Sequence, residues 1–194
     1  MSKNIEGKFL VAPPHMRDER FKKTVIYLWK HDVTGSAGVI INKPLESPNW
    51  SDVCQEGNIV SAPSINPVMF WGGPVMSSVI GCLHSMDYSI NQTNTNLSGN
   101  NIGFTMDKSI INAIAQNKGP KQYITTLGIV SWDIGQLEEE LDALPPRKQL
   151  ESWLILDFDP NLLWSGENPE LWNSCVNSCI FEKSREYVSK FVKD

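Results

Sequence analysis

The stretch TVIYLWKHDVTGSAGVIINK, residues 24–43, holds the strongest signal for the fold. Its first part, TVIYLWKH, is rich in β-branched and aromatic side chains, and AGVIINK follows after a short run of turn-forming residues. The two runs are predicted to form a β-hairpin. Because neither run alternates cleanly between apolar and polar residues, we expect the strands to be covered on both faces.

The glycines of this stretch raise the question of an anion-binding loop. The segment TGSAG lacks the Gly-Lys-Ser/Thr ending of a P-loop and precedes a strand rather than a helix, and it contains no Gly-x-Gly-x-x-Gly. We therefore expect Gly35 to supply a positive φ in the hairpin turn, and Gly38 to allow close backbone approach within the sheet.

Outside the hairpin, strand and helix patterns are interspersed without a regular β-α-β order, which favours a mixed α+β fold. Further strands are expected at residues 7–12, 68–74, 79–84, 122–132 and 151–158, with 68–74 and 79–84 paired. Helices are expected at residues 50–55, from Thr105 or Asp107 to Gly119, from a cap at Asp133 to Leu144, and from a cap at Asn168 onwards. The Asn-rich segment 89–101 is predicted to be an exposed loop.

The overall composition is that of a globular protein, and we expect one domain spanning residues 1–194, with a helical extension at 166–194. A formal net charge of -5 argues against a protein that holds nucleic acid by neutralising phosphates. The start of the chain lacks the pattern of a signal peptide, and no run approaches the ~20 apolar residues of a membrane helix. We expect a cytoplasmic protein without membrane contact.

The four cysteines, Cys54, Cys82, Cys175 and Cys179, form no Cys-x-x-Cys pair. Cys175 and Cys179 share a helix face, but no matching His or Cys pair accompanies them. Buried thiols are therefore the expected outcome, and no metal or cofactor is predicted.

Three histidines, His15, His31 and His84, are candidates for a general base. Ser36, His31 and Asp18 could form a Ser-His-Asp set, but nothing resembles a Gly-x-Ser-x-Gly elbow. The plainer interpretation is that these histidines are structural. The carboxylates at positions 138–140 and 142 are expected to form a solvated helix face.

Two glycine-containing turns are of more interest. WGGPV (71–75) ends one predicted strand, and SWDIGQLEEEL (131–141) joins another to a helix whose free N–H groups could receive an anion or a carbonyl. If these turns meet in the fold with Asn42 and Lys43 nearby, they would line a shallow polar pocket.

The order of these motifs resembles the bacterial YqgE/AlgH family over residues 7–165. The resemblance is carried by Gly35-x-x-Gly38 leading to Asn42-Lys43-Pro44, then Gly72-Gly73-Pro74, Leu83-His84 and Trp132-x-x-Gly135-Gln136-Leu137-Glu138. The chain departs from the family pattern at Ala12-Pro13-Pro14 and at Ser152, which indicates a divergent member.

The resemblance implies an α+β fold with a mixed, partly barrel-like sheet flanked by helices, and no established reaction. One member was linked to control of alginate production, hence the label of transcriptional regulator, although this sequence shows no helix-turn-helix pattern.

We therefore expect a non-catalytic binding or regulatory protein that acts on an unknown small ligand or protein partner. The expected ligand-binding residues are Asn42, Lys43, Gly72, Gly73, Trp132, Gly135 and Gln136, with Asp18, His31 and His84 as supporting polar residues. Two alternatives stay open. One is a hydrolase-like enzyme with His31 or His84 as base and an oxyanion site at the helix that begins near Gly135. The other is a protein-interaction module that acts as a dimer.

Overall fold

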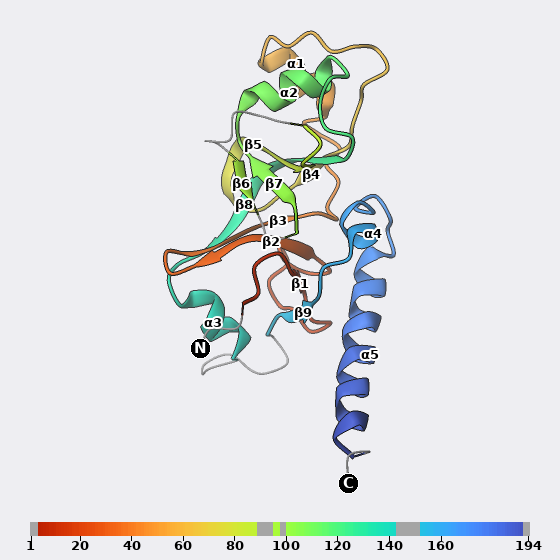
Figure 1. Ribbon diagram of the computed structural model, residues 1–194. Helices are drawn as coiled ribbons and strands as arrows, with labels where there is room; N and C mark the ends of the chain where they lie inside the picture. Colours follow the sequence, from red (N-terminus) through yellow and green to blue (C-terminus); the bar gives the residue numbers. More distant parts are fainter. Residues whose placement is uncertain (1–3, 89–94, 98–99, 143–151, 192–194) are drawn as a thin grey trace.

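The computed structural model describes residues 4–88, 95–97, 100–142 and 152–191, which form one mixed β-sheet with helices around it (Figure 1). The strands are β1 (Phe9–Val11), β2 (Val25–Asp32), β3 (Gly35–Ile40), β4 (Met69–Trp71), β5 (Val75–Ser85), β6 (Thr95–Leu97), β7 (Ile102–Thr105), β8 (Tyr123–Trp132) and β9 (Leu154–Leu156). The helices are α1 (Trp50–Glu56), α2 (Lys108–Ala115), α3 (Gln136–Leu141), α4 (Pro160–Leu163) and α5 (Leu171–Phe191).

The predicted hairpin is confirmed as β2 and β3, which pair from Ile26↔Ile40 to Asp32↔Gly35. Gly35 has a φ of 118°, as expected for the turn. A Cβ at Gly38 would lie 2.8 Å from the Tyr27 carbonyl oxygen, so the expected close backbone approach is also found. All of β3 is buried, which agrees with strands covered on both faces.

The strands are ordered β6-β7-β5-β8-β3-β2-β1-β9, and β4 is added to β8 in parallel. This confirms the mixed α+β class with a sheet flanked by helices. The sheet is open rather than closed into a barrel, because β6 and β9 form its two ends in the described part of the chain. Strand β8 joins its two halves, pairing with β5 from Tyr123 and with β3 at Val130 to Trp132.

The expected pairing of segments 68–74 and 79–84 is wrong. Both β4 and β5 pair with residues 125–127 of β8, so they lie on opposite edges of that strand. The connection at residues 72–74 therefore has to cross β8, and it does so where Gly73 passes over Gly128. A Cβ on either of these glycines would lie 2.3 Å from backbone atoms of the other segment, which explains why glycines stand there.

Two further expectations need correction. Residues 95–97 form β6 on the edge of β7 instead of a loop, because Thr95 and Leu97 take up a regular register with Thr105 and Gly103. The rest of the expected loop, 89–94 and 98–99, lies outside the described residues.

Helix α3 has Gly135 rather than Asp133 at its N-cap, although the Gln136 side chain accepts a hydrogen bond from the Asp133 N–H at 3.0 Å, as predicted for a capping box. Leu144 also lies outside the described residues.

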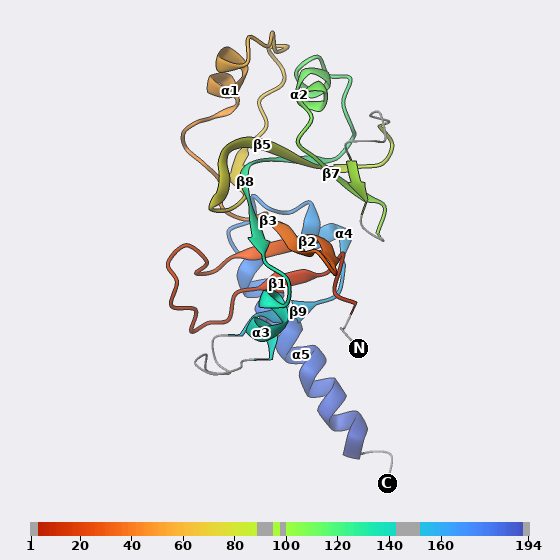
Figure 2. The same cartoon turned by 90° about the vertical axis from the view of Figure 1, so that its left-hand side faces the viewer.

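Three groups of buried side chains hold the helices to the sheet. Because neighbouring strand residues point to opposite faces, Phe9 packs with α4 and α5, whereas Leu10 packs with Leu137 of α3. Helices α1 and α2 cover the end of the sheet formed by β4, β5 and β8, as the side view shows (Figure 2). Capping by Asp107 at α2 and by Asn168 near the start of α5 is as predicted.

All four cysteines are free and buried, in agreement with the expected thiols. No group of three or more His, Cys, Asp or Glu side chains that could hold a metal ion is found among the described residues. In the same part of the chain, no helix combines the length and the apolar character needed to cross a membrane.

Candidate functional site

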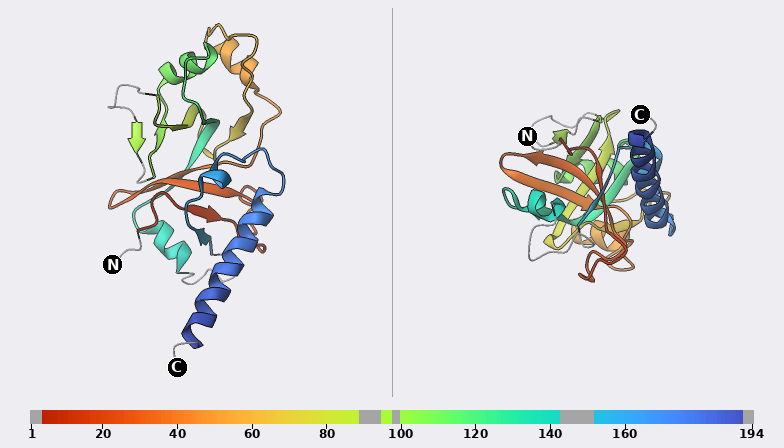
Figure 3. Two further views of the ribbon diagram at one scale, coloured as in Figure 1. Left: turned by 45° about the vertical axis from the view of Figure 1, so that its right-hand side comes forward. Right: turned by 90° about the horizontal axis from the view of Figure 1, so that it is seen from below.

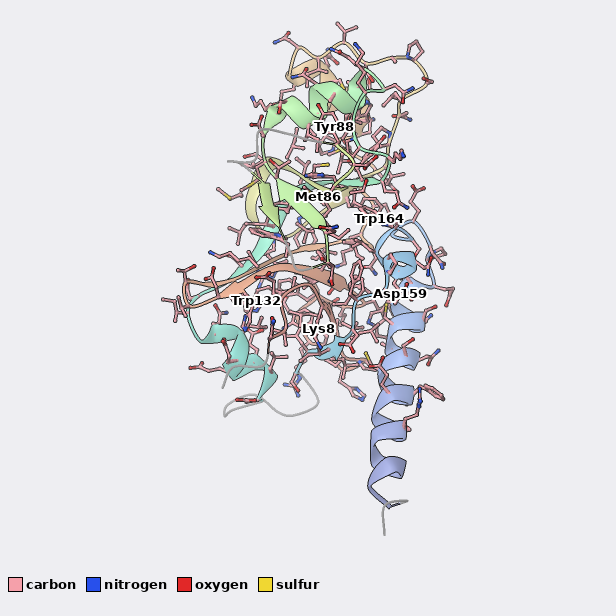
Figure 4. All side chains as sticks on the ribbon, in the orientation of Figure 1. Lys8, Met86, Tyr88, Trp132, Asp159 and Trp164 are labelled. Atoms are coloured by element: carbon pink, nitrogen blue, oxygen red, sulfur yellow. The ribbon has the colours of Figure 1, made fainter. Side chains whose placement is uncertain are left out.

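A polar pocket of about 420 Å³ lies beside α3, at the end of β8. Its walls come from the loop at residues 16–21, the last residues of β8, one face of α3, Pro74 and Trp153. Figure 4 labels Trp132 next to α3, on the side of the molecule away from Asp159 and Trp164. The volume falls within the range of about 300–1,000 Å³ that is typical of small-molecule sites.

Glu140 lies on the wall of this pocket and is only 7% exposed. Its Oε2 accepts hydrogen bonds from the indole N–H groups of Trp132 at 3.1 Å and Trp153 at 2.9 Å, and its Oε1 accepts one from the Gln136 amide at 3.2 Å. The two indoles meet edge to face, with centroids 6.3 Å apart. Because Gln136 and Glu140 are four residues apart on α3, they share a helix face. The carboxylate is thus fixed from a strand, a helix and the segment before β9.

An ion pair forms another part of the wall. Arg20 donates to both carboxylate oxygens of Asp18, through Nε at 3.0 Å to Oδ1 and Nη2 at 2.7 Å to Oδ2. The hydrogen bond from Arg20 lowers the pKa of Asp18, so the carboxylate stays ionised. Phe21, the next residue, meets the Trp153 ring edge to face at 5.7 Å.

Some of the residues predicted from the sequence line this pocket, and others do not. Trp132, Gln136 and Asp18 line the pocket, and so does Pro74, which directly follows Gly72 and Gly73. Pro74 of the WGGPV turn and Gln136 of the SWDIGQLEEEL turn thus line the same pocket, whereas Gly72, Gly73 and Gly135 are not among its lining residues. Gly135 supplies the left-handed N-cap of α3, with a φ of 78°.

Asn42 and Lys43 stand outside the pocket wall. The Asn42 amide accepts from the Val25 N–H and donates to the Lys23 carbonyl, both at 2.8 Å, so it fixes the start of β2. The Lys43 ammonium donates to the Arg20 carbonyl at 2.7 Å and lies 5.4 Å from the Trp71 ring centroid. Burial lowers the pKa of Lys43. Lys43 thus supports the loop that carries the ion pair.

Of the three candidate histidines, none lines the pocket, and His31 and His84 lie near opposite ends of β8. His31 Nδ1 is 2.8 Å from Ser36 Oγ, and its Nε2 is 3.7 Å from a Glu138 oxygen, so Glu138 takes the place that Asp18 was expected to hold. Ser36 is only 5% exposed, which keeps its hydroxyl from a substrate. His84 is buried; its Nδ1 lies 3.0 Å from the Ser85 carbonyl oxygen, and its Nε2 has no hydrogen-bond partner. Burial lowers the pKa of His84.

Sequence reasoning missed Glu140, which was expected on a solvated helix face. Glu139 is exposed and Glu138 partly exposed, but Glu140 turns inward one helical turn after Gln136. The signal that Glu140 is buried was its spacing, because Gln136 stands four residues before it and buried Leu137 stands three residues before it. Arg17, Arg20 and Trp153 were not singled out either, because no motif marks them.

A second cavity of about 660 Å³ lies between α1, α2 and the first half of β5. Its lining is mainly apolar, with Val53, Ile59, Val79 and Ile111 among the wall residues. None of the sequence-predicted site residues lines it.

The open mixed sheet, the crossing at Gly73 and the pocket beside α3 define an α+β protein with a small polar cavity and no metal-binding cluster in the described residues. Residues 9–184 match the family model described as AlgH-like. The chain belongs to this AlgH-like family.

Relatives and a solved structure agree with this assignment. A UPF0301 protein of Methylobacterium nodulans is 36% identical over 170 residues, which cover 83% of this chain and 77% of the relative. One from a Bradyrhizobium species is 36% identical over 175 residues, covering 86% and 76%. The solution structure of AlgH from Pseudomonas aeruginosa matches with a TM-score of 0.73 and 28% identity, over 93% of this chain and 92% of AlgH. A crystal structure from Corynebacterium diphtheriae, at 18% identity and a TM-score of 0.61 over 89% and 85%, shares the fold.

Proposed function

We propose that this protein is a non-catalytic binding protein that holds a small polar ligand in the pocket beside α3. The observation that carries the proposal is Glu140, a buried carboxylate oriented by two indoles and an amide on the pocket wall. These donors lie on or next to regular elements, so the site is organised before a ligand arrives. Preorganisation of this kind limits the entropy lost on binding.

The other lining residues suit a ligand with both polar and ring-like or apolar parts. Gln136 and the Asp18–Arg20 pair offer donors and acceptors, whereas Phe21 and Trp153 offer aromatic surface. Sites for small metabolites combine a few fixed polar groups with such surfaces. The proposal also places the protein in the cytoplasm. The four free thiols support this location.

Two features weigh against catalysis in this pocket. Its described lining residues include no histidine, cysteine or lysine. Asp18 would be a poor general base, because its pKa is lowered by the hydrogen bond from Arg20.

The acidic net charge gives no support to a nucleic-acid ligand. Any regulatory role would then follow from ligand binding.

A thermal-shift screen against nucleotides, sugars, phosphates and small metabolites tests the proposal. A ligand at 100 times its Kd should stabilise the folded state by about 2.7 kcal/mol. The variant Gln136→Ala should lose most of this response, because the side chain is exposed at the pocket and also orients Glu140. The matched control Ser78→Ala, on the wall of the α1–α2 cavity, should respond like the unaltered protein.

Two results would contradict the proposal. One is the absence of any hit across these ligand classes. The other is a hit that Gln136→Ala binds unchanged while Ser78→Ala loses it, since that would move the site to the second cavity.

A further inference from the structure

Exposed apolar side chains gather around the cavity of about 660 Å³ between α1 and α2, at the end of the molecule opposite the far end of α5 (Figure 3). Met106 lines the cavity and is 38% exposed. Met76 and Val60, which are 51% and 87% exposed, directly adjoin the lining residues Ser77 and Ile59 in the chain. Large apolar side chains grouped around a hollow usually mark a binding surface, and methionines adapt to apolar partners of different shape.

Strand β5 forms one wall of this cavity, and part of its backbone has no strand partner. Its register with β8 skips residues 76–79, and its pairing with β7 begins only at Cys82. Residues 76–79 are therefore unpaired in the register on both edges, as far as the described residues show. Met76 has a φ of 52° at the start of this bulge, a left-handed conformation that is uncommon for a long side chain. Ser77 and Ser78 from this run are exposed and line the cavity.

Two charged residues on the cavity wall stand at the unfavourable ends of their helices. Glu56 is the last residue of α1, and Lys108 is the first residue of α2. The helix dipole disfavours an anion at a C-terminus and a cation at an N-terminus. Both residues are exposed, and neither takes part in an ion pair among the described residues. Side chains that go against such a local preference are expected at functional sites.

We propose that this cavity binds an extended apolar segment of a partner protein, which carries a basic side chain near Glu56 and an acidic side chain near Lys108. The backbone of the segment pairs with residues 76–79 as an added strand, and its apolar side chains enter the cavity. Strand addition of this kind draws affinity from main-chain hydrogen bonds and specificity from side-chain pockets. The charged flanks of the segment complement the two helix ends.

A polypeptide is the ligand that uses all of these features. A small apolar molecule would leave the unpaired backbone of β5 and the two rim charges without a partner. The site is also distinct from the pocket beside α3, because the two share no lining residue. The protein therefore has a polar pocket at one end of its sheet and a peptide-binding groove at the other.

Selection from a phage-displayed library of short random peptides on the full-length protein tests the proposal. Enriched peptides should carry apolar residues at alternating positions, because successive side chains of a strand point to opposite faces. They should also carry one acidic and one basic flank. A selected peptide, capped at both ends, should bind in isothermal titration calorimetry. Methylation of its central backbone nitrogens removes N–H donors and should weaken binding by about tenfold.

Charge reversal tests the role of Lys108. Lys108→Glu should weaken binding of the selected peptide by about fivefold or more, whereas the helix should stay folded because an acidic residue suits the start of α2. Replacing the acidic residue of the peptide with lysine should restore binding to this variant. The matched control Lys118→Glu makes the same change in charge at an exposed position past the end of α2, and it should bind the peptide like the unaltered protein.

A pair of methionines tests the apolar wall. Met106→Ser should weaken binding by about fivefold, and the partial exposure of this side chain keeps the risk to the fold low. Met86 is the matched control, because it is also 38% exposed but follows the other end of β5. Met86→Ser should therefore bind the selected peptide like the unaltered protein.

Several results would overturn the proposal. One is a selection that enriches no peptide, or only peptides without alternating apolar residues. Equal binding of the methylated and unmethylated peptides would exclude an added strand. Equal effects of Lys108→Glu and Lys118→Glu, or of Met106→Ser and Met86→Ser, would place the peptide elsewhere. An average mass above 21.8 kDa that Met106→Ser returns to this value would identify a second copy as the occupant, and binding of dodecanoate in place of any peptide would identify a small apolar ligand.

Discussion

The two ends of the sheet differ in how a buried ionisable side chain is hydrogen-bonded, Glu140 at the α3 end and His84 at the α2 end. Beside α3, Glu140 receives hydrogen bonds from three N–H donors, and Ser36 is within hydrogen-bond distance of His31. Beside α2, the buried ring of His84 leaves Nε2 without a partner, and the cavity there is mainly apolar. The α3 end thus holds a buried carboxylate with several donors, whereas the α2 end holds a buried ring with one nitrogen unpaired.

This difference between the two ends indicates where in the fold a buried carboxylate can be accommodated. A carboxylate placed among apolar side chains without donors would be strongly disfavoured. The α3 end tolerates one because two tryptophans, 8 residues before Glu140 and 13 residues after it in the chain, supply donors to it. Three predictions test the contrast between the ends, beginning with the residue that joins them.

The largest effect is expected for Gly73→Ala, at the crossing over β8. A Cβ there would lie 2.3 Å from the Ile129 carbonyl carbon and oxygen, and the φ of 151° is itself unfavourable for alanine. Overpacking against backbone should lower the free energy of unfolding by about 4 kcal/mol or more, damaging both ends. Urea denaturation measures this loss in the free energy of unfolding. Gly135→Ala is the matched control, because its φ is also positive but no atom lies within 4 Å of the added Cβ. It should lose only about 1–2 kcal/mol, and an equal loss in both variants would contradict the crossing.

Glu140→Ala should weaken the α3 end alone. The change leaves the buried indole N–H groups of Trp132 and Trp153 without the acceptor they share. An unsatisfied buried donor destabilises by about 1–3 kcal/mol, so we expect a total of about 2–4 kcal/mol in urea denaturation followed by tryptophan fluorescence. Glu139→Ala, one position earlier and exposed, should change stability by less than about 0.5 kcal/mol. Similar losses in the two variants would show that the carboxylate does not hold the indoles.

The smallest effect concerns the pH dependence contributed by His84 at the α2 end. Burial lowers its folded-state pKa below the ordinary value of 6.5, so the unfolded chain takes up the proton first as pH falls. The stability from the neutral ring is therefore complete above about pH 6.5 and declines below it, by at most about 1.4 kcal/mol per pH unit. His84→Gln should flatten this slope in urea denaturation between pH 7 and 5. His15→Gln, at an exposed site, should keep it. An unchanged slope in His84→Gln would place the titrating group elsewhere.

Local sequence determined much of this protein. The β-branched runs around Gly35 specified the hairpin, because strand propensity and a positive φ act within a few residues. Asp107 and Asn168 marked helix starts for the same reason, since caps need only neighbouring N–H groups. The ordered glycine and tryptophan motifs also carried the family resemblance and brought Trp132 and Gln136 into the candidate site.

Tertiary structure decided the remainder. The parallel placement of β4 and the crossing at Gly73 depend on segments that lie far apart in the chain. Trp153 follows Glu140 by 13 residues, and this separation along the chain does not predict that the two side chains are in contact. Such contacts follow from how whole elements pack around β8, and no pattern within a short window encodes them. The sequence therefore determined which elements form, and the packing determined which of their side chains share a pocket.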